Sequence, residues 1–270
     1  MNKKHTPNSR RQFLKNTAIG AAGFMIVPRH VLGRGYTPPS DKLNMAAIGA
    51  GGKGWSDIRN AWQDGANNVG AFCDMDASHA KRARKQWPDA AYYKDFRVML
   101  EEMKDEIDAV TISTPDHTHG VAAMTAMELG MHVYVQKPLT HNIYEARQLT
   151  EGARKHRVVT QMGNQGASNP GQQWIVEQFE EGVIGAVHTV HCWTNRPVWP
   201  QGIPFPTEMP ARPEHLSADD WDLFIGPADY VDYHPLFHPF KWRGWWNFGT
   251  GALGDMGCHI VDTPFRVLEL

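Results

Sequence analysis

The feature that most constrains this chain is a glycine-rich turn that joins an apolar run to a helical stretch. Leu43 to Ile48 is a short apolar run of the strand type. Gly49, Gly51 and Gly54 follow it in the spacing G-x-G-x-x-G, and a helical pattern continues to about residue 64. A strand that runs through such a turn into a helix predicts the first half of a βαβ unit.

A second strand pattern completes that unit. Val69 to Cys73 is apolar and ends at Asp74, twenty residues beyond the last glycine of the turn. Parallel strands joined through helices form an α/β fold whose ligands lie at the carboxyl ends of the strands. The sequence therefore predicts a doubly wound domain with its binding site at the glycine turn.

Each part of this motif has a physical role in binding a dinucleotide. Gly49 permits the tight turn, Gly51 lets the backbone approach a pyrophosphate, and Gly54 lets the helix pack closely on the strand. The helix N-terminus attracts the anion. Asp74 would accept hydrogen bonds from the ribose and repel a 2′-phosphate, which favours NAD over NADP. The alternative is a glycine turn that binds nothing.

A further strand ends in polar residues that belong at the same edge of the sheet. Ile107 to Ser113 has the pattern of a buried parallel strand, and Thr114 and Pro115 follow it. The next helix begins between residues 116 and 119. We expect Thr114, Pro115 and His119 to lie beside the dinucleotide.

Two more strands complete the first domain, which we place at residues 43–165. His132 to Val135 is followed by Gln136, Lys137 and a proline, then by a helix over residues 142–156 and a strand over residues 158–162. Proline fixes the chain after Lys137, so the lysine is placed to face the nicotinamide of a bound NAD. A surface lysine is the ordinary alternative.

The remaining residues, 166–270, have a different pattern. A helix is predicted near residues 172–181 and a strand over residues 186–193, followed by long segments rich in Pro, Trp and Gly. The tryptophans exceed what one small core can bury, and their flat rings suit stacking on a sugar. We expect Trp199, Arg243 and Trp246 to contact the substrate. A Trp-rich contact between subunits is the alternative.

A short segment near the C-terminus groups three titratable side chains. If residues 254–262 are helical, Asp255, His259 and Asp262 lie on one face, because they are four and three residues apart. An acid, a base and a second acid that could orient the base would then stand together.

The first residues have the layout of an export signal. Residues 1–33 carry six Lys or Arg and no acid, with paired arginines in the stretch Ser9 to Lys15 and a small-residue apolar run from Thr17 to Val27. This resembles a twin-arginine signal, which implies export to the periplasm. The apolar run is too short to span a membrane, so we expect no stable membrane anchor. An amphipathic first helix is the alternative; residues 34–42 are predicted to be a linker.

Charge and cysteine content exclude other classes of protein. Outside residues 1–33 the chain carries 21 basic and 29 acidic side chains, which argues against a nucleic-acid partner. Three cysteines without a C-x-x-C pair cannot form a disulfide framework or a four-thiolate zinc site. His234 and His238 are four apart, but the proline between them disfavours a helix, so no metal site is predicted.

Taken together, four motifs resemble those of the Gfo/Idh/MocA family, which includes glucose-fructose oxidoreductase and inositol dehydrogenase. They are the glycine turn with Asp74, the stretch STPDHTH at residues 113–119, the turn at residues 136–139, and the D-x-x-x-H of Asp255 and His259. The resemblance covers the chain from about residue 43 onward. It implies a Rossmann NAD-binding domain, an α+β domain with a mainly antiparallel open sheet, and catalytic roles for Lys137, Asp255 and His259.

Two departures from the family pattern stand out. The family usually has Glu before its lysine, whereas Gln136 is neutral and would hydrogen-bond the cofactor without a charge. Family members also continue through several more strands, so we expect the second domain to be truncated at Leu270, with an open sheet edge. The resemblance implies a homo-oligomer for the full-length form.

The resemblance also implies a hydride transfer from a secondary hydroxyl of a sugar, glycoside or polyol to NAD. In this hypothesis His259 removes the hydroxyl proton, Asp255 binds the substrate, Asp262 orients the imidazole, and Lys137 stabilises the oxyanion. Export favours tightly bound NAD that is regenerated in place. Two alternatives remain: an NAD-dependent glycosidase that oxidises its substrate transiently, and a non-catalytic nucleotide- or sugar-binding protein or inactive fragment.

Overall fold

The computed structural model describes Pro38 and residues 41–270. The predicted signal, residues 1–33, lies outside the described residues, as does most of the predicted linker, residues 34–42. The chain divides into two compact units between Lys42 and Leu43, and the account below concerns the second unit, Leu43–Leu270.

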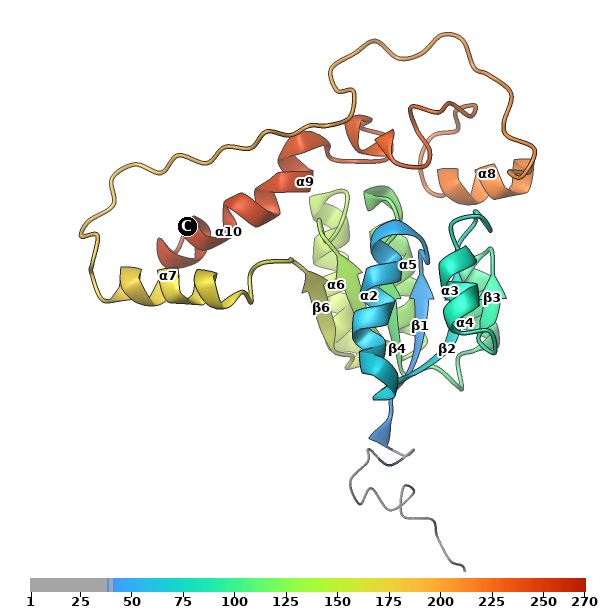
Figure 1. The fold of residues 1–270 in the computed structure, drawn as a ribbon, viewed down its shortest axis with the longest axis horizontal. Helices are drawn as coiled ribbons and strands as arrows, with labels where there is room; N and C mark the ends of the chain where they lie inside the picture. Colours follow the sequence, from blue (N-terminus) through green and yellow to red (C-terminus); the bar gives the residue numbers. More distant parts are fainter. Residues whose placement is uncertain (1–37, 39–40) are drawn as a thin grey trace, which may run out of the picture. The chain divides into compact units, whose positions relative to one another are not determined.

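A six-stranded parallel sheet forms the first half of this unit (Figure 1). The strand order is β3-β2-β1-β4-β5-β6, so successive strands are added outward from β1 on one side and outward from β4 on the other. The position between β1 and β4 is the switch point where α/β folds bind ligands. The strands are β1 (Asn44–Ile48), β2 (Asn68–Cys73), β3 (Ala91–Tyr93), β4 (Ala109–Ile112), β5 (His132–Gln136) and β6 (Thr160–Gly163). The Rossmann arrangement predicted from the glycine turn is confirmed.

Helices connect these strands, and local sequence sets where they begin. Asn142 caps one of them with a reciprocal pair of hydrogen bonds to Glu145, and Asp95 caps another by accepting from the amide of Arg97. These helices are α2 (Gly52–Trp62), α3 (Lys81–Gln86), α4 (Phe96–Glu102), α5 (Asp116–Glu128) and α6 (Ile143–His156), with a 3₁₀ turn, η2 (Gln63–Gly65), after α2.

Alternation along the strands builds a core on each face of the sheet. In β1, Ala46 and Ile48 pack into one buried cluster with residues of β4, β5 and α5, whereas Met45 and Ala47 pack into another with Ile58 of α2. Successive strand residues point to opposite faces, so a short apolar run fills both layers. The sheet is thereby buried on both sides, and its carboxyl edge remains to form a site.

The second half contains helices and irregular segments. Its helical elements are α7 (Pro170–Glu180), α8 (Ala218–Ile225), η3 (Lys241–Gly244), α9 (Gly251–Ile260) and α10 (Asp262–Val267). The strand predicted over residues 186–193 was wrong, and the structure forms no strand anywhere in residues 166–270. A strand needs a hydrogen-bonded neighbour, and none of the described residues pairs its backbone with residues 186–193.

Aromatic side chains form the core of this half. Trp221, Phe237 and Phe248 are fully buried, and Trp242 and Trp245 pack into the same cluster. The expectation that the tryptophans exceed one small core is therefore correct only in part. The exposed fraction is 80% for Trp193 and 76% for Trp246, but Trp199, Trp242 and Trp245 are buried.

Polar contacts attach the second half to the carboxyl edge of the sheet. Lys94 Nζ lies 2.6 Å and 2.8 Å from the two carboxylate oxygens of Asp220 in α8. The buried ring of His117, at the start of α5, lies within hydrogen-bond distance of the carbonyl oxygens of Phe224 and Phe248. Figure 1 accordingly shows α8 and α9 beyond the ends of the strand arrows.

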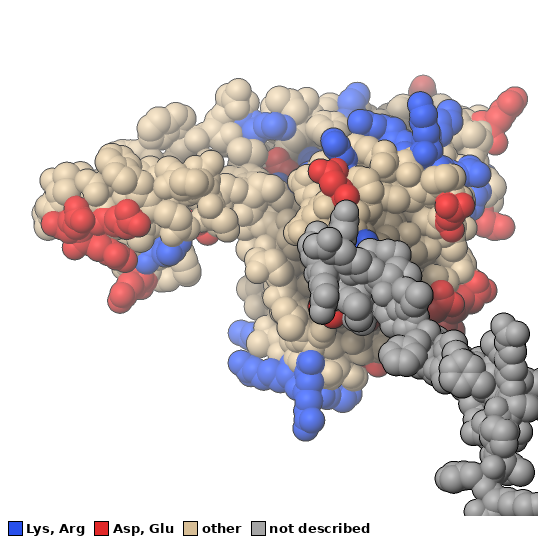
Figure 2. Space-filling model, turned by 60° about the horizontal axis from the view of Figure 1, so that its bottom comes forward, with Lys and Arg blue, Asp and Glu red and all other residues tan. Residues whose placement is uncertain are grey.

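Among the described residues, none of the helices combines the length and the apolar character needed to cross a bilayer. Figure 2 shows basic side chains in separate groups on the face drawn, with acidic side chains next to some of them.

Candidate active site

A cavity of about 740 Å³ lies at the carboxyl edge of the sheet. Its walls come from the ends of β1, β2, β4 and β5, and from α8, η3 and α9 of the second half. A volume of several hundred Å³ is usual for a site that encloses a cofactor or a small molecule. The two halves of the chain therefore share one site.

The glycine turn at one end of the cavity has no room for side chains. A Cβ on Gly49 would lie 2.6 Å from the carbonyl oxygen of Ser113, and Gly49 has a φ of +84°. A Cβ on Gly54 would lie 1.8 Å from the carbonyl oxygen of Gly49. Helix α2 thus packs directly on the turn, which is the role predicted for Gly54.

The first turn of α2 is open to an anion. Gly51, Gly52 and Lys53 line the cavity, and the N-cap residue, Gly51, has no side chain of its own to cap the helix. Uncapped amide groups at a helix N-terminus carry partial positive charge and bind phosphate oxygens. This end of the cavity fits a pyrophosphate.

Asp74 lies at the end of β2, beside the turn. One carboxylate oxygen accepts from the amides of Ala50 and Gly51 at 3.1 Å each, and the other accepts from the amide of Asp76. Burial raises the pKa of Asp74 above its ordinary value, although these hydrogen bonds oppose the rise. The carboxylate lines the cavity at the place where the motif predicts a ribose. The residues present at this end of the cavity therefore fit NAD.

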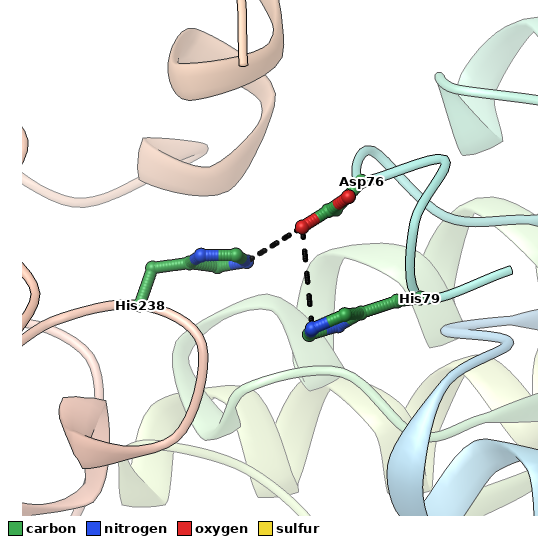
Figure 3. A group of neighbouring side chains, drawn as sticks. All are labelled: Asp76, His79 and His238. Carbon is green, nitrogen blue, oxygen red and sulfur yellow. Dashed lines mark ion pairs between the residues drawn. The ribbon is translucent and has the colours of Figure 1, made fainter. Parts of the chain in front are cut away.

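A histidine cluster stands beside this nucleotide end. His234 and His238 do not act together: His234 accepts from the amide of Leu236, whereas His238 faces Asp76 and His79 (Figure 3). The nitrogen Nε2 of His238 lies 3.9 Å from Asp76 Oδ2. His238 therefore faces the loop after β2, which is far from it in the chain.

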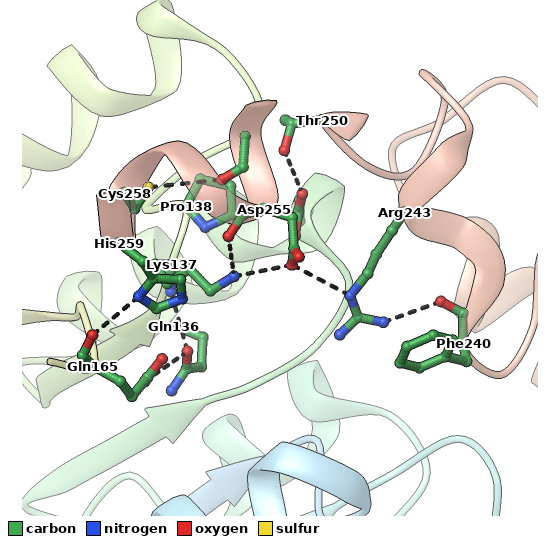
Figure 4. A network of polar contacts seen from close by, with 12 residues as sticks. Gln136, Lys137, Pro138, Gln165, Phe240, Arg243, Thr250, Asp255, Cys258 and His259 are labelled. Carbon is green, nitrogen blue, oxygen red and sulfur yellow. Dashed lines mark hydrogen bonds and ion pairs between the residues drawn. The ribbon is translucent and has the colours of Figure 1, made fainter. Parts of the chain in front are cut away.

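At the other end of the cavity, Lys137 meets the second half (Figure 4). Its Nζ donates to the carbonyl oxygen of Asp255 at 2.6 Å and to Asp255 Oδ1 at 2.9 Å. Arg243 Nε approaches the same Oδ1 at 3.5 Å. One partly buried carboxylate therefore faces two cations, and the carboxylate of Asp116 is also close enough to interact with both of them.

His259 lies one turn beyond Asp255 in α9 and lines the same cavity. Its Nδ1 lies 3.0 Å from the carbonyl oxygen of Gln165. A carbonyl can only accept, so Nδ1 carries the proton and Nε2 is the basic nitrogen of the neutral ring. The prediction that Asp262 orients this imidazole was wrong: Asp262 accepts from Asn164, and a backbone carbonyl takes its place.

Two buried acids were not among the predicted site residues. Asp57 of α2 accepts from Gln136 Nε2 at 2.7 Å and from Ser113 Oγ at 2.8 Å, and so fixes the residue before Lys137. Asp116 lines the cavity, and burial raises its pKa. An acid at the first turn of a helix after a strand was the available signal for Asp116; Asp57 gave none.

Of the three residues predicted after β4, Thr114 and Pro115 line the cavity and His119 does not. The ring of His119 is buried, with Nε2 lying 2.9 Å from the carbonyl oxygen of Thr114 and Nδ1 2.8 Å from that of Pro138. His119 therefore links two strand-end loops rather than contacting a ligand. The position of His119 in the stretch STPDHTH could not show which way its ring points.

The predicted substrate residues also divide. Arg243 lines the cavity, and its guanidinium carbon lies 4.1 Å from the ring centroid of Trp242 and 4.6 Å from that of Phe240. Trp199 is buried, 5.9 Å from the same guanidinium, and Trp246 packs beside His141. Neither of these two tryptophans lines the cavity, so only Arg243 retains a place at the substrate.

Comparison with protein families identifies both halves. Residues 43–164 match the model of the oxidoreductase family with an NAD-binding Rossmann fold, GFO_IDH_MocA, and residues 201–269 match its C-terminal alpha/beta domain. The two matched segments belong to one family and together span most of the chain.

Curated relatives are distant. The uncharacterized oxidoreductase YrbE of Bacillus subtilis (strain 168) is 27% identical over 225 residues, covering 81% of this chain and 62% of the relative. Glycosyl hydrolase family 109 protein 1 of Shewanella sp. (strain ANA-3) is 25% identical over 199 residues, covering 65% of this chain and 43% of the relative. The chain thus spans less than two thirds of the length of each.

Solved structures similar to the chain include an NAD-binding protein from Listeria innocua, with a TM-score of 0.48 and 24% identity over 53% of this chain and 42% of that one. Another is scyllo-inositol dehydrogenase from Lactobacillus casei, with a TM-score of 0.49 and 20% identity over 53% of this chain and 42% of that one. From the two family matches, with the strand order and glycine turn that accompany them, the chain belongs to the Gfo/Idh/MocA oxidoreductase family.

Proposed function

We propose that this chain is an NAD-dependent oxidoreductase that acts on a secondary hydroxyl of a sugar, glycoside or polyol. The observation that carries the proposal is the meeting of Lys137, Asp255 and His259 in the cavity that also contains the glycine turn. Lys137 of the first half and Asp255 and His259 of the second half provide a cation, an acid and a base at the end of the cavity away from the glycine turn.

The bound NAD would supply the hydride acceptor for the carbinol carbon. Gly51 and the first turn of α2 would hold its pyrophosphate, and Asp74 its ribose. The carboxylate of Asp74 favours the 2′-hydroxyl of NAD over the 2′-phosphate of NADP.

The catalytic work of the chain begins with a proton at His259. Because Nδ1 donates to Gln165, Nε2 is placed as the general base that removes the hydroxyl proton of the substrate. The ammonium of Lys137 then stabilises the negative charge that develops on that oxygen. Asp255 holds Lys137 through two contacts and binds the neighbouring hydroxyl group.

Arg243 selects for a polar substrate. Its guanidinium carbon lies near the rings of Trp242 and Phe240 and its Nη1 donates to the carbonyl oxygen of Phe240, so its position is fixed at the wall of the cavity. Planar N–H donors suit the adjacent hydroxyl groups of a sugar or cyclic polyol. The proposed role of Arg243 is therefore orientation of the substrate, with proton transfer at His259.

The test is to incubate the purified chain with NAD and a panel of sugars and cyclic polyols and to follow NADH formation. We expect at least one substrate to turn over, and His259→Asn to lower kcat about 10²-fold to 10⁴-fold with NAD affinity unchanged. Asp262→Asn is the matched control, because Asp262 contacts Asn164 rather than His259. Full turnover in His259→Asn would remove the proposed base.

A second candidate function is glycoside cleavage by transient oxidation at the same site. It is favoured by the similarity to Shewanella proteins named glycosyl hydrolase family 109. Release of an aglycone without net NADH formation would select cleavage, whereas a stable keto sugar with stoichiometric NADH would select the dehydrogenase. NAD binding without either product would select the non-catalytic alternative.

We also propose that the protein is exported by the twin-arginine route and retains its NAD. The paired arginines and the small-residue run support export, and scarcity of free NAD outside the cytoplasm favours a retained cofactor. Denaturing the exported protein and identifying the released nucleotide tests the second point. Replacement of both Arg10 and Arg11 by lysine should keep the chain in the cytoplasm, whereas the unaltered chain should be exported.

A further inference from the structure

We propose that Asp76, His79 and His238, which Figure 3 shows together, form a zinc-binding site beside the nucleotide end of the cavity, and that His215, near Asp76, supplies a fourth ligand. The site would join the loop after β2, which carries Asp76 and His79, to the second half of the chain. This inference is independent of the proposed reaction.

Geometry gives the first argument. One oxygen of Asp76, Oδ2, lies 4.0 Å from His79 Nε2, 3.6 Å from His215 Nε2 and 3.9 Å from His238 Nε2. These separations exceed hydrogen-bond length. They are close to the ligand-to-ligand distance of about 3.3 Å in a tetrahedral site with zinc-to-ligand distances of about 2.0–2.1 Å. The ligand atoms of Asp76, His79 and His238 all lie within 4.8 Å of one another, so small side-chain rotations would bring these three onto one ion.

Support around the ligands gives the second argument. The other oxygen of Asp76, Oδ1, accepts from the amide of Ser78 at 2.8 Å, which fixes the carboxylate with Oδ2 toward the histidines. The rings of His79 and His238 are stacked with centroids 5.4 Å apart. Hydrogen bonds that orient a ligand from outside are typical of metal sites.

Burial and charge give the third argument. Asp76 and His238 are buried, from two parts of the chain far apart in sequence. The carboxylate of Asp76 would supply one negative charge toward a divalent cation, and imidazole ligates as the neutral ring. Imidazole nitrogens with one carboxylate are a ligand set that zinc prefers. The exposed His215 would close the fourth position.

The test uses the full chain, freed of metal with a chelator, and zinc chloride as the probe. We expect one zinc per chain by elemental analysis after dialysis, and a rise in the thermal midpoint when zinc is added. Cobalt(II) in place of zinc should give the intense visible absorption of a four-coordinate ion. Absence of that absorption, or less than half an equivalent of bound zinc, would overturn the site.

Substitutions locate the ion. His238→Gln and Asp76→Asn should each weaken zinc binding at least about tenfold, measured by competition with a chromogenic chelator. His191→Gln is the matched control, since His191 is exposed and outside the cluster. Unchanged zinc affinity in His238→Gln and Asp76→Asn would overturn the assignment. If either variant fails to fold, the cobalt spectrum of the unaltered chain decides alone.

Discussion

The two halves of this chain reach the same cavity by different means. Residues 43–165 form a parallel sheet whose strands are hydrogen-bonded to one another and buried by helices on both faces. Residues 166–270 contain no strand in the structure, and their core is a cluster of aromatic rings placed against the sheet by polar contacts. In the first half, the hydrogen bonds of the sheet hold the site residues in place. In the second half, the site residues are held in place because this half packs against the carboxyl edge of the sheet.

This difference separates binding from chemistry. The nucleotide end of the cavity depends on local geometry, chiefly the glycine turn and Asp74. The catalytic end depends on contacts across the halves, chiefly between Lys137 and Asp255. Damage to the first half should abolish folding and nucleotide binding together, whereas damage to the docking contacts should spare nucleotide binding.

The largest effect is expected at Gly54. Its replacement by alanine would place a Cβ 1.8 Å from the carbonyl oxygen of Gly49, so α2 must move away from the turn. We expect Gly54→Ala to lose both cooperative unfolding and NAD binding, measured by thermal denaturation and calorimetric titration. Gly257→Ala is the control: its Cβ would have an ordinary contact at 3.6 Å, so alanine should be tolerated. Normal NAD binding by Gly54→Ala would contradict the close-packing argument.

Next comes Lys137, which belongs to the first half but acts with the second. Lys137→Met keeps the length of the side chain and removes its charge, so we expect kcat to fall about 10²-fold to 10³-fold while the Kd for NAD changes little. Steady-state kinetics and calorimetry measure the two. Lys155→Met, at an exposed position in α6, should leave both unchanged. A parallel loss of NAD affinity in Lys137→Met would place this lysine in binding instead.

Acid should weaken the docking through His117. Burial lowers the pKa of His117 to about 4, below the ordinary 6.5 of an unfolded chain. The unfolded state therefore binds more protons between these values, and the free energy of unfolding falls as pH drops from about 6.5 to about 4, by on the order of 3 kcal/mol.

Denaturant unfolding at several pH values measures this slope. His117→Asn removes the titration, so its free energy of unfolding should fall less steeply over the same pH range. His238 contributes in the same direction, because burial also lowers its pKa to about 4. Identical slopes in the two proteins would show that His117 is not the group responsible.

A smaller effect is expected at the ion pair between Lys94 and Asp220. Lys94→Met leaves the buried carboxylate of Asp220 without its cation, although Ser217 still donates to it. Because Lys94 is nearly half exposed, we expect a loss of only about 1–2 kcal/mol in the free energy of unfolding. Lys104→Met breaks an exposed pair and should not change stability. NAD binding should survive in Lys94→Met.

The difference between the halves also explains what the sequence could predict. Turn chemistry and apolar runs are local, so the glycine turn and five of the six strands were readable from short segments, whereas β3 (Ala91–Tyr93) was not predicted. A helix over residues 254–262 was a condition of the sequence argument; α9 meets it for Asp255 and His259 but ends at Ile260, before Asp262.

Docking contacts are not local, and there the predictions failed. Nothing in the segment around His119 shows that its ring joins the carbonyl oxygens of Thr114 and Pro138. The strand predicted over residues 186–193 had the correct composition but has no pairing partner among the described residues. Trp199 was predicted to be an exposed ring that stacks on the substrate, but it is buried and lies beside Arg243 and Phe240, which come from a distant part of the chain.

One oxygen atom, Oδ1 of Asp255, faces both Lys137 and Arg243. If one of these cations is neutralised or displaced, the carboxylate of Asp255 interacts more strongly with the other, so the contributions of Lys137 and Arg243 are coupled. Their substitutions should therefore be non-additive in a double-mutant cycle. A substrate that binds the guanidinium of Arg243 would, through this shared oxygen, change the electrostatic interaction between Asp255 and the ammonium of Lys137 before the hydride is transferred.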